Sequence, residues 1–264
     1  MTHAFDKDYW EQHWHGGEAS MGGHPPNPYL APETAGLAPG TALDAGCGSG
    51  AEAIWLAERG WHVTAADISS HALAAAARRP TSGDATGRLH WVRADLTTWR
   101  PDAPFDLVMT HYAHPAMPQL DFYDRIAGWV APGGTLLIVG HLHTHDAPDP
   151  TPGPDGPTAG HAHTPGAATG HAHTGHAHTG HAHTGHAHTG HAHTGHAHTG
   201  AAHSGAAAGH GHHPPAEASA TPAAITARLP RTQWEIVTAQ EHVRTLPGRP
   251  VPLHDVVVRA TRHR

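Results

Sequence analysis

Residues 43–50 read Leu43-Asp44-Ala45-Gly46-Cys47-Gly48-Ser49-Gly50. The apolar residues 41–43 at its start predict a strand, and the helical pattern of residues 51–59 behind it ends at Gly60. Glycine allows a tight turn and the close approach of a ligand to the backbone, which a side chain would block. A glycine-rich turn between a strand and a helix predicts a nucleotide-binding site in an α/β domain.

Strand and helix patterns alternate after this turn. Apolar stretches predict strands over residues 61–66, 89–94, 105–110 and 135–139, and helical periodicity predicts helices over residues 69–79 and 120–130. Strands that are apolar on both faces and alternate with helices indicate a buried, mostly parallel sheet in a doubly wound α/β fold. Near the N-terminus, Tyr9, Trp10 and Trp14 fall at the spacing of a short amphipathic helix, which a loop follows.

Histidine is concentrated in one part of the chain. Of the 33 histidines, 18 lie between His161 and His213, and residues 170–199 consist of six consecutive Gly-His-Ala-His-Thr units. This stretch has almost no large apolar residue with which to bury a core, so we predict a disordered insertion over residues 146–215. It divides one domain into residues 1–145 and residues 216–264, where a helix over 222–229 and strands over 233–237 and 254–260 are expected.

The repeated imidazoles predict weak and interchangeable binding of divalent nickel, zinc or copper, because neutral histidine is a common ligand of all three. The first candidates are His171, His173, His176, His178, His181 and His183. Metal storage, a neutrally expanded repeat and a pH-responsive segment all remain open for this stretch. The first of these gives an alternative function, a metal buffer on an enzyme-like scaffold.

Two acidic residues follow later strands of the expected sheet. Asp67 ends the second strand about twenty residues after the glycine turn, where a carboxylate reaches the ribose hydroxyls of a bound adenosine. Asp95 ends the third strand at the same edge. The glycine turn and both acids together predict one ligand site.

These residues resemble the class I S-adenosylmethionine-dependent methyltransferases, whose first motif looks like Leu43 to Gly50. The resemblance covers about residues 37–142 and 222–262, and residues 9–14 are similar to the helix that often covers the cofactor in that family. It implies a Rossmann-like, seven-stranded sheet with a terminal antiparallel strand, and a small-molecule methyl acceptor. By this resemblance, the cofactor S-adenosylmethionine would contact Asp44, Gly46, Gly48, Gly50, Asp67, Ile68, Asp95, Leu96 and His111.

A nicotinamide-dependent oxidoreductase is an alternative, since Gly46-x-Gly48-x-x-Ala51 also fits the dinucleotide pattern. Asp44 favours the methyltransferase, because a carboxylate beside the turn would attract a cationic amino group or sulfonium and repel a pyrophosphate.

Catalysis could require a general base if the methyl acceptor carries a proton. His111 follows the fourth strand beside the expected methyl group and is the candidate, with His114 and His141 weaker ones. A purely structural histidine is the competing interpretation for each. Cys47 is not expected to be a nucleophile, because a small residue between two glycines is explained by lack of space.

Charge and length exclude other classes of protein. The 264 residues carry a formal net charge of −7, which gives no basic field for nucleic acid. No run of about eighteen apolar residues is present to span a membrane. The single cysteine, Cys47, and a polar N-terminus predict a cytoplasmic protein without an internal disulfide, and the sequence indicates no oligomeric state.

Overall fold

A computed structural model describes residues 5–21, 24–142, 218–245 and 252–264. The predicted insertion at 146–215, its six candidate metal ligands and the turn predicted at Pro247 and Gly248 lie outside these described residues. The division of the chain at residues 145 and 216 therefore stays a prediction.

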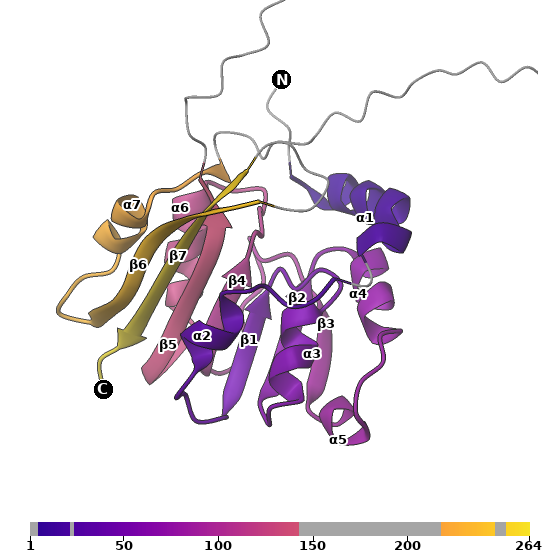
Figure 1. The fold of residues 1–264 in the computed structure, drawn as a ribbon, viewed down its shortest axis with the longest axis horizontal. Coiled ribbons are helices and arrows are strands. Elements are labelled where there is room, and N and C mark those ends of the chain that lie inside the picture. The colour runs from indigo at the N-terminus through magenta and orange to yellow at the C-terminus, as the bar shows by residue number, and fades with distance from the viewer. Residues whose placement is uncertain (1–4, 22–23, 143–217, 246–251) are drawn as a thin grey trace, which may run out of the picture. The chain divides into compact units, whose positions relative to one another are not determined.

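The described residues form one seven-stranded sheet with the strand order β3-β2-β1-β4-β5-β7-β6 (Figure 1). Strand β7 is antiparallel to both of its neighbours, and all other pairs are parallel. The predicted mostly parallel sheet with a terminal antiparallel strand is confirmed. The strands are β1 (Thr41–Ala45), β2 (His62–Asp67), β3 (Leu89–Arg93), β4 (Phe105–His111), β5 (Val130–His141), β6 (Trp234–Arg244) and β7 (Leu253–Arg262).

Helices cover both faces of the sheet and give it two separate cores. Along β4, Leu107 and Met109 pack into the core formed with α3, whereas Val108 packs into the core formed with α6 and α7. This alternation follows from the period of two in a strand and explains why the strands are apolar throughout. The helices are α1 (Lys7–Met21), α2 (Leu30–Thr34), α3 (Ala51–Ala57), α4 (Ser70–Ala77), α5 (Gly83–Thr86), α6 (Gln119–Ala127) and α7 (Pro222–Ala227).

Some predicted boundaries were wrong. The expected helix over 120–130 ends at Ala127, and β5 begins at Val130, which pairs with Phe105 before a register shift in β4. This irregularity accommodates Pro132, Gly133 and Gly134, the residues that suggested a break before the strand. The short helices α2 and α5 were not expected, and β6 is longer than predicted because its polar half is an exposed edge strand.

The sheet order reverses at β1, whose neighbours are β2 on one side and β4 on the other. Loops that follow adjacent parallel strands leave in opposite directions at such a point and open a crevice at the carboxyl edge of the sheet. The glycine turn follows β1, so the fold places it at this crevice.

Candidate functional site

A pocket of about 740 Å³ lies at the carboxyl edge of the sheet. Seven of the nine residues predicted to contact a cofactor line it: Gly46, Gly48, Asp67, Ile68, Asp95, Leu96 and His111. Asp44 and Gly50 do not line it. The structure thus brings together residues from the ends of β1, β2, β3 and β4.

The glycine turn is shaped by close neighbours. Gly46 has φ +82° and Gly48 has φ +50°, a region that favours glycine. A Cβ atom on Gly46 would collide with Ala113, and one on Gly48 would lie 2.8 Å from the Trp14 ring. Trp14 therefore rests on the turn, as a covering helix would require. Gly50, at φ +73°, is needed instead for packing, because a Cβ there would collide with Trp91.

Asp67 holds the turn and also faces the pocket. Its Oδ2 accepts the N–H of Gly48 at 2.8 Å and its Oδ1 accepts the N–H of Ser69 at 2.9 Å. Burial raises the pKa of Asp67 against these hydrogen bonds, and the residue is only 8% exposed. Each carboxylate oxygen still has a lone pair for a ligand hydroxyl.

Asp44, which was expected to contact the cofactor beside the turn, lies beneath the turn and does not line the pocket. It is 1% exposed, and its Oδ2 has no hydrogen-bond partner within the described part of the chain. Burial raises its pKa well above the usual range, and the negative charges of Glu52 and Asp67 add to the shift. Glu52 and Asp67 line the pocket, so three carboxyl groups surround the turn.

The end of β3 supplies the remaining predicted contacts. Oδ1 of Asp95 accepts the N–H and the hydroxyl of Thr97, at 2.9 Å and 2.7 Å, which fixes the loop after the strand. Leu96 is buried and gives this end of the pocket an apolar wall.

His111 is the last residue of β4 and lines the pocket. Neither ring nitrogen has a hydrogen-bond partner among the described residues, although both are buried. Burial lowers the pKa of His111, so the ring is neutral at neutral pH. His114 instead shares a hydrogen bond with Gln119, and His141 stacks on Tyr112 at 4.3 Å. The geometry thus separates His111 from the two weaker candidates.

Cys47 is buried, and burial raises the pKa of its thiol further above neutrality. The protonated thiol is a poor nucleophile, as expected from the sequence.

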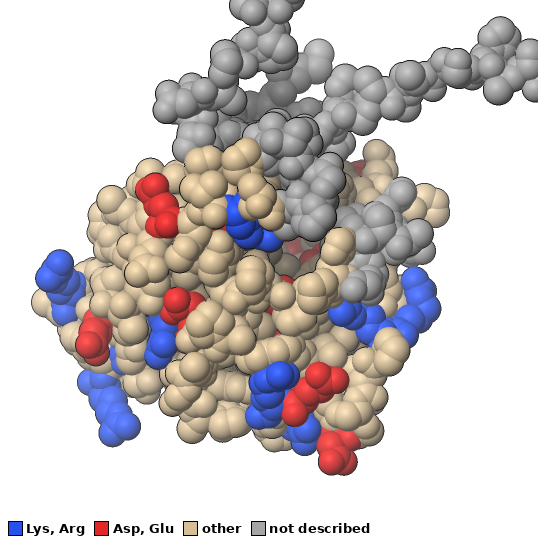
Figure 2. Space-filling view, in the orientation of Figure 1, with Lys and Arg blue, Asp and Glu red and all other residues tan. Residues whose placement is uncertain are grey.

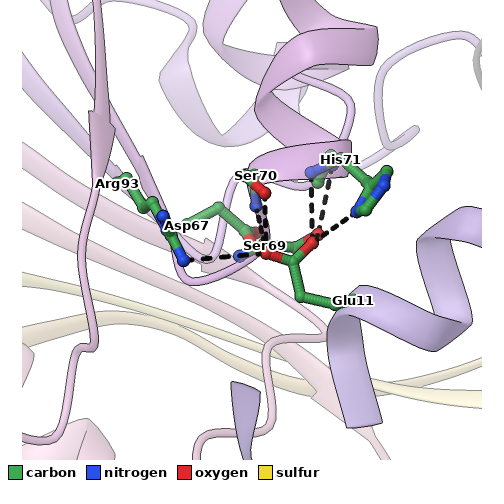
Figure 3. A network of polar contacts seen from close by, with 7 residues as sticks. Glu11, Asp67, Ser69, Ser70, His71 and Arg93 are labelled. Carbon is green, nitrogen blue, oxygen red and sulfur yellow. Dashed lines mark hydrogen bonds and ion pairs between the residues drawn. The ribbon is translucent and has the colours of Figure 1, made fainter. Parts of the chain in front are cut away.

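Glu11, which no sequence pattern singled out, joins α1 to α4 (Figure 3). Its carboxylate accepts five hydrogen bonds, from the backbone and hydroxyl of Ser70, the hydroxyl of Ser69, and the backbone and ring of His71. Burial opposes ionisation of Glu11, but these bonds outweigh it and hold its pKa well below the usual range. The partners lie 58–60 residues away, so no local spacing could indicate them.

A second polar group missed by sequence reasoning lies at the other end of the pocket. Arg244, from β6, donates through Nε to Asp255 and through Nη2 to the Tyr112 hydroxyl at 2.9 Å. Tyr112 donates to Asp255 at 2.9 Å and has φ +57°, a strained value for a tyrosine. Arg244 and Tyr112 both line the pocket, and strain of this kind is concentrated at functional sites.

Comparison with known families bears on the part of the chain that forms most of this site. Residues 42–134, which include the glycine turn, Asp67, Asp95 and His111, match a family described as a methyltransferase domain. This part of the chain is therefore similar to a methyltransferase domain.

Curated relatives named as methyltransferases match a limited part of the chain. An uncharacterized methyltransferase of Mycobacterium tuberculosis is 39% identical over 99 residues, which are 37% of this chain and 48% of that protein. The trans-aconitate 2-methyltransferase of Streptomyces avermitilis is 39% identical over 108 residues, 38% of each chain. The chain spans less than half the length of these curated relatives.

Solved structures resemble this chain in fold. TehB from Haemophilus influenzae has a TM-score of 0.55 at 12% identity, over 94% of this chain and 66% of that one. A structure described as "Conversion of a Disulfide Bond into a Thioacetal Group during Echinomycin Biosynthesis" has a TM-score of 0.54 at 19% identity, over 97% and 91%. At these identities the likeness establishes the Rossmann-like fold alone.

Within the described ranges, no group of three or more His, Cys, Asp or Glu side chains is placed to hold a metal ion. No described helix has the length and apolar character needed to cross a bilayer. On the face drawn in Figure 2, basic and acidic side chains are interspersed.

Replacing Glu11 by alanine should loosen α1 from α4 and the rest of the fold. Loss of the acceptor for the first N–H groups of α4 should lower the free energy of unfolding by about 1–2 kcal/mol, as for other helix caps. Thermal unfolding would measure the loss of stability, and limited proteolysis would measure how readily α1 is cleaved. Asp8→Ala, an exposed acid on the same helix, is the control. Equal stability and protease resistance in both variants would show that Glu11 does not fasten the helix.

Proposed function

We propose that this protein is an S-adenosylmethionine-dependent methyltransferase that acts on a small-molecule acceptor. One observation carries the proposal: Asp44, Glu52 and Asp67 crowd three carboxyl groups around the glycine turn, and Asp44 Oδ2 is buried without a partner among the described residues. Like charges gathered in this way favour a ligand that brings positive charge. S-adenosylmethionine carries an ammonium and a sulfonium, and the methyltransferase family match to residues 42–134 supports it.

The pocket suits this cofactor along its whole length. We assign the methionine end to Gly46 and Gly48, the ribose hydroxyls to Asp67, and the adenine to Ile68, Asp95 and Leu96, with Asp44 acting from beneath the turn. The order of these residues follows the strand order β1, β2, β3, so an extended ligand would lie along the edge of the sheet. Gly50 packs on Trp91 and does not line the pocket, so we assign it no contact with the cofactor.

The same acids oppose the oxidoreductase alternative. A dinucleotide would place its pyrophosphate against the glycine turn, where Glu52 and the ionised forms of Asp44 and Asp67 would repel it. The metal-buffer alternative concerns residues outside the described part of the chain, and both it and a cytoplasmic location stay predictions.

Methyl transfer requires little from the protein except positioning and removal of a proton. S-adenosylmethionine supplies an electrophilic methyl group, and the C–S bonding pair stays on sulfur as the bond from the acceptor forms. His111 is neutral and has an unpartnered nitrogen in the described structure, so it can accept the proton of a hydroxyl, thiol or amine acceptor. The Trp10 and Trp14 side chains, which line the pocket from α1, exclude water from the reacting groups.

Binding of the cofactor should release protons. A cation stabilises the Asp44 carboxylate and not the neutral acid, so binding should lower the raised pKa of Asp44. Affinity should therefore increase with pH until Asp44 is ionised in the free protein, and be constant above that pH. Calorimetry in buffers of different ionisation enthalpy, with S-adenosylmethionine and with NAD, measures both affinity and protons released.

The matched variants are Asp44→Asn and Asp84→Asn, the second an exposed acid on α5. Asp44→Asn should bind S-adenosylmethionine more weakly and release fewer protons, while Asp84→Asn should behave as the wild type. Tight binding of NAD, or no binding of S-adenosylmethionine by the folded wild type, would overturn the proposed function.

A further inference from the structure

The pocket is longer than the proposed cofactor site. In the strand order, the assigned cofactor residues follow β3, β2 and β1, and His111 ends β4. The strands on the far side of β4 are β5, β7 and β6, and the pocket continues there to Arg244, the last residue of β6. A methyl acceptor must approach from this side, because the other side of His111 belongs to the cofactor.

Arg244 is held rigidly from behind. Asp255, on β7, is 0% exposed and accepts hydrogen bonds from Arg244 Nε, from the Tyr112 hydroxyl at 2.9 Å and from the Tyr29 hydroxyl at 3.1 Å. The Tyr112 hydroxyl in turn accepts Arg244 Nη2. Three donors therefore satisfy the one carboxylate, and they fix the plane of the guanidinium before any ligand arrives.

At the Arg244 end of the pocket, a ligand meets hydrogen-bond donors. The Arg244 side chain is 26% exposed whereas Asp255 is buried, and no hydrogen bond to Arg244 Nη1 is found among the described residues. A guanidinium stays charged at every relevant pH, and its planar N–H groups match the two oxygens of a carboxylate. Glu52 lines the same pocket, but its Oε1 accepts the Asn27 N–H at 2.9 Å.

We propose that the methyl acceptor bears a carboxylate, that Arg244 binds this carboxylate, and that the group to be methylated points from there toward His111. Arg244 is then the residue that determines acceptor specificity. The inference rests on the proposed function, since it uses the position of the methyl group to assign the two ends of the pocket.

Paired acceptors that differ only in the carboxylate test this assignment. We would compare mercaptopropionate with propanethiol, para-hydroxybenzoate with para-cresol, and alanine with ethylamine, using the full chain and saturating S-adenosylmethionine. The acid of at least one pair should have a kcat/KM about tenfold or more above its partner, the effect of one charge-assisted contact. Arg244→Met should remove that preference, mainly through KM, and Arg231→Met, an exposed arginine, should keep it.

Arg244→Met leaves Asp255 as a buried unpaired charge, which could unfold the variant. A second variant is therefore needed that keeps the fold. The double variant Arg244→Met with Asp255→Asn removes both charges and should also lose the preference, with unchanged affinity for S-adenosylhomocysteine by calorimetry. A preference for the uncharged partners, no methylation of any acid, or a carboxylate preference that survives in the folded double variant each overturns the inference. Failure to bind S-adenosylmethionine is a distinct result that overturns the proposed function as well.

Discussion

Replacing His111 by alanine should lower the turnover number about a hundred- to ten-thousandfold with an acceptor that loses a proton, as is typical for loss of a general base. His111 is the one histidine of the three candidates for which both ring nitrogens are buried without a partner among the described residues. Affinity for S-adenosylmethionine should change little, because the base acts on the acceptor. Steady-state kinetics and calorimetry on the same preparations separate the two quantities.

The pH dependence gives this prediction a second readout. Burial lowers the pKa of His111 from its ordinary value of 6.5, so the neutral base is present at neutral pH and is lost only as the pH falls through the lowered pKa. The wild type should show this acid limb in kcat, and His111→Ala should not. His62→Ala, an exposed histidine on β2, should behave as the wild type. Near-normal turnover of His111→Ala would show that positioning alone suffices for transfer.

Replacing Asp67 by alanine should weaken S-adenosylmethionine binding by about 1.5–3 kcal/mol, which is about ten- to a hundredfold, through loss of charge-assisted hydrogen bonds to the ribose. The structure adds a further reason for a large effect. Asp67 also accepts the Gly48 N–H, so the variant would release the glycine turn from the end of β2. Calorimetric titration measures the loss.

The matched variants separate these two contributions. Asp67→Asn keeps one acceptor oxygen and should lie between alanine and the wild type, whereas Asp102→Ala, an exposed acid, should bind normally. Unchanged affinity in a folded Asp67→Ala protein would contradict the ribose assignment. Circular dichroism and thermal unfolding would establish the fold of each variant.

The sequence predicted those parts of the site that are local in the chain. The glycine turn and Asp67 are contiguous with their strands, and the apolar runs of β1, β2 and β4 made a buried sheet the natural interpretation. Because parallel strands end at one edge, the convergence of Asp67, Asp95 and His111 could be predicted without coordinates.

The parts that were missed depend on distant partners. Arg244 meets Tyr112 across 132 residues, and Glu11 meets Ser69 across 58. Neither residue has a spacing that marks it, because Glu11 lies in an amphipathic helix and Arg244 lies in a polar edge strand. Asp44 was expected to contact the cofactor beside the turn, but it lies beneath the turn, because a sequence shows which residue precedes a turn and not where its side chain points.

Ser69 couples docking of the N-terminal helix to ligand binding at the proposed ribose site. Its N–H donates to Asp67 and its hydroxyl donates to Glu11, so one residue joins the two carboxylates (Figure 3). Under the proposed function, any free energy by which docking of α1 strengthens cofactor binding must equally strengthen docking when the cofactor is bound. An N-terminal truncation should then increase the dissociation rate of the cofactor before it lowers the stability of the sheet.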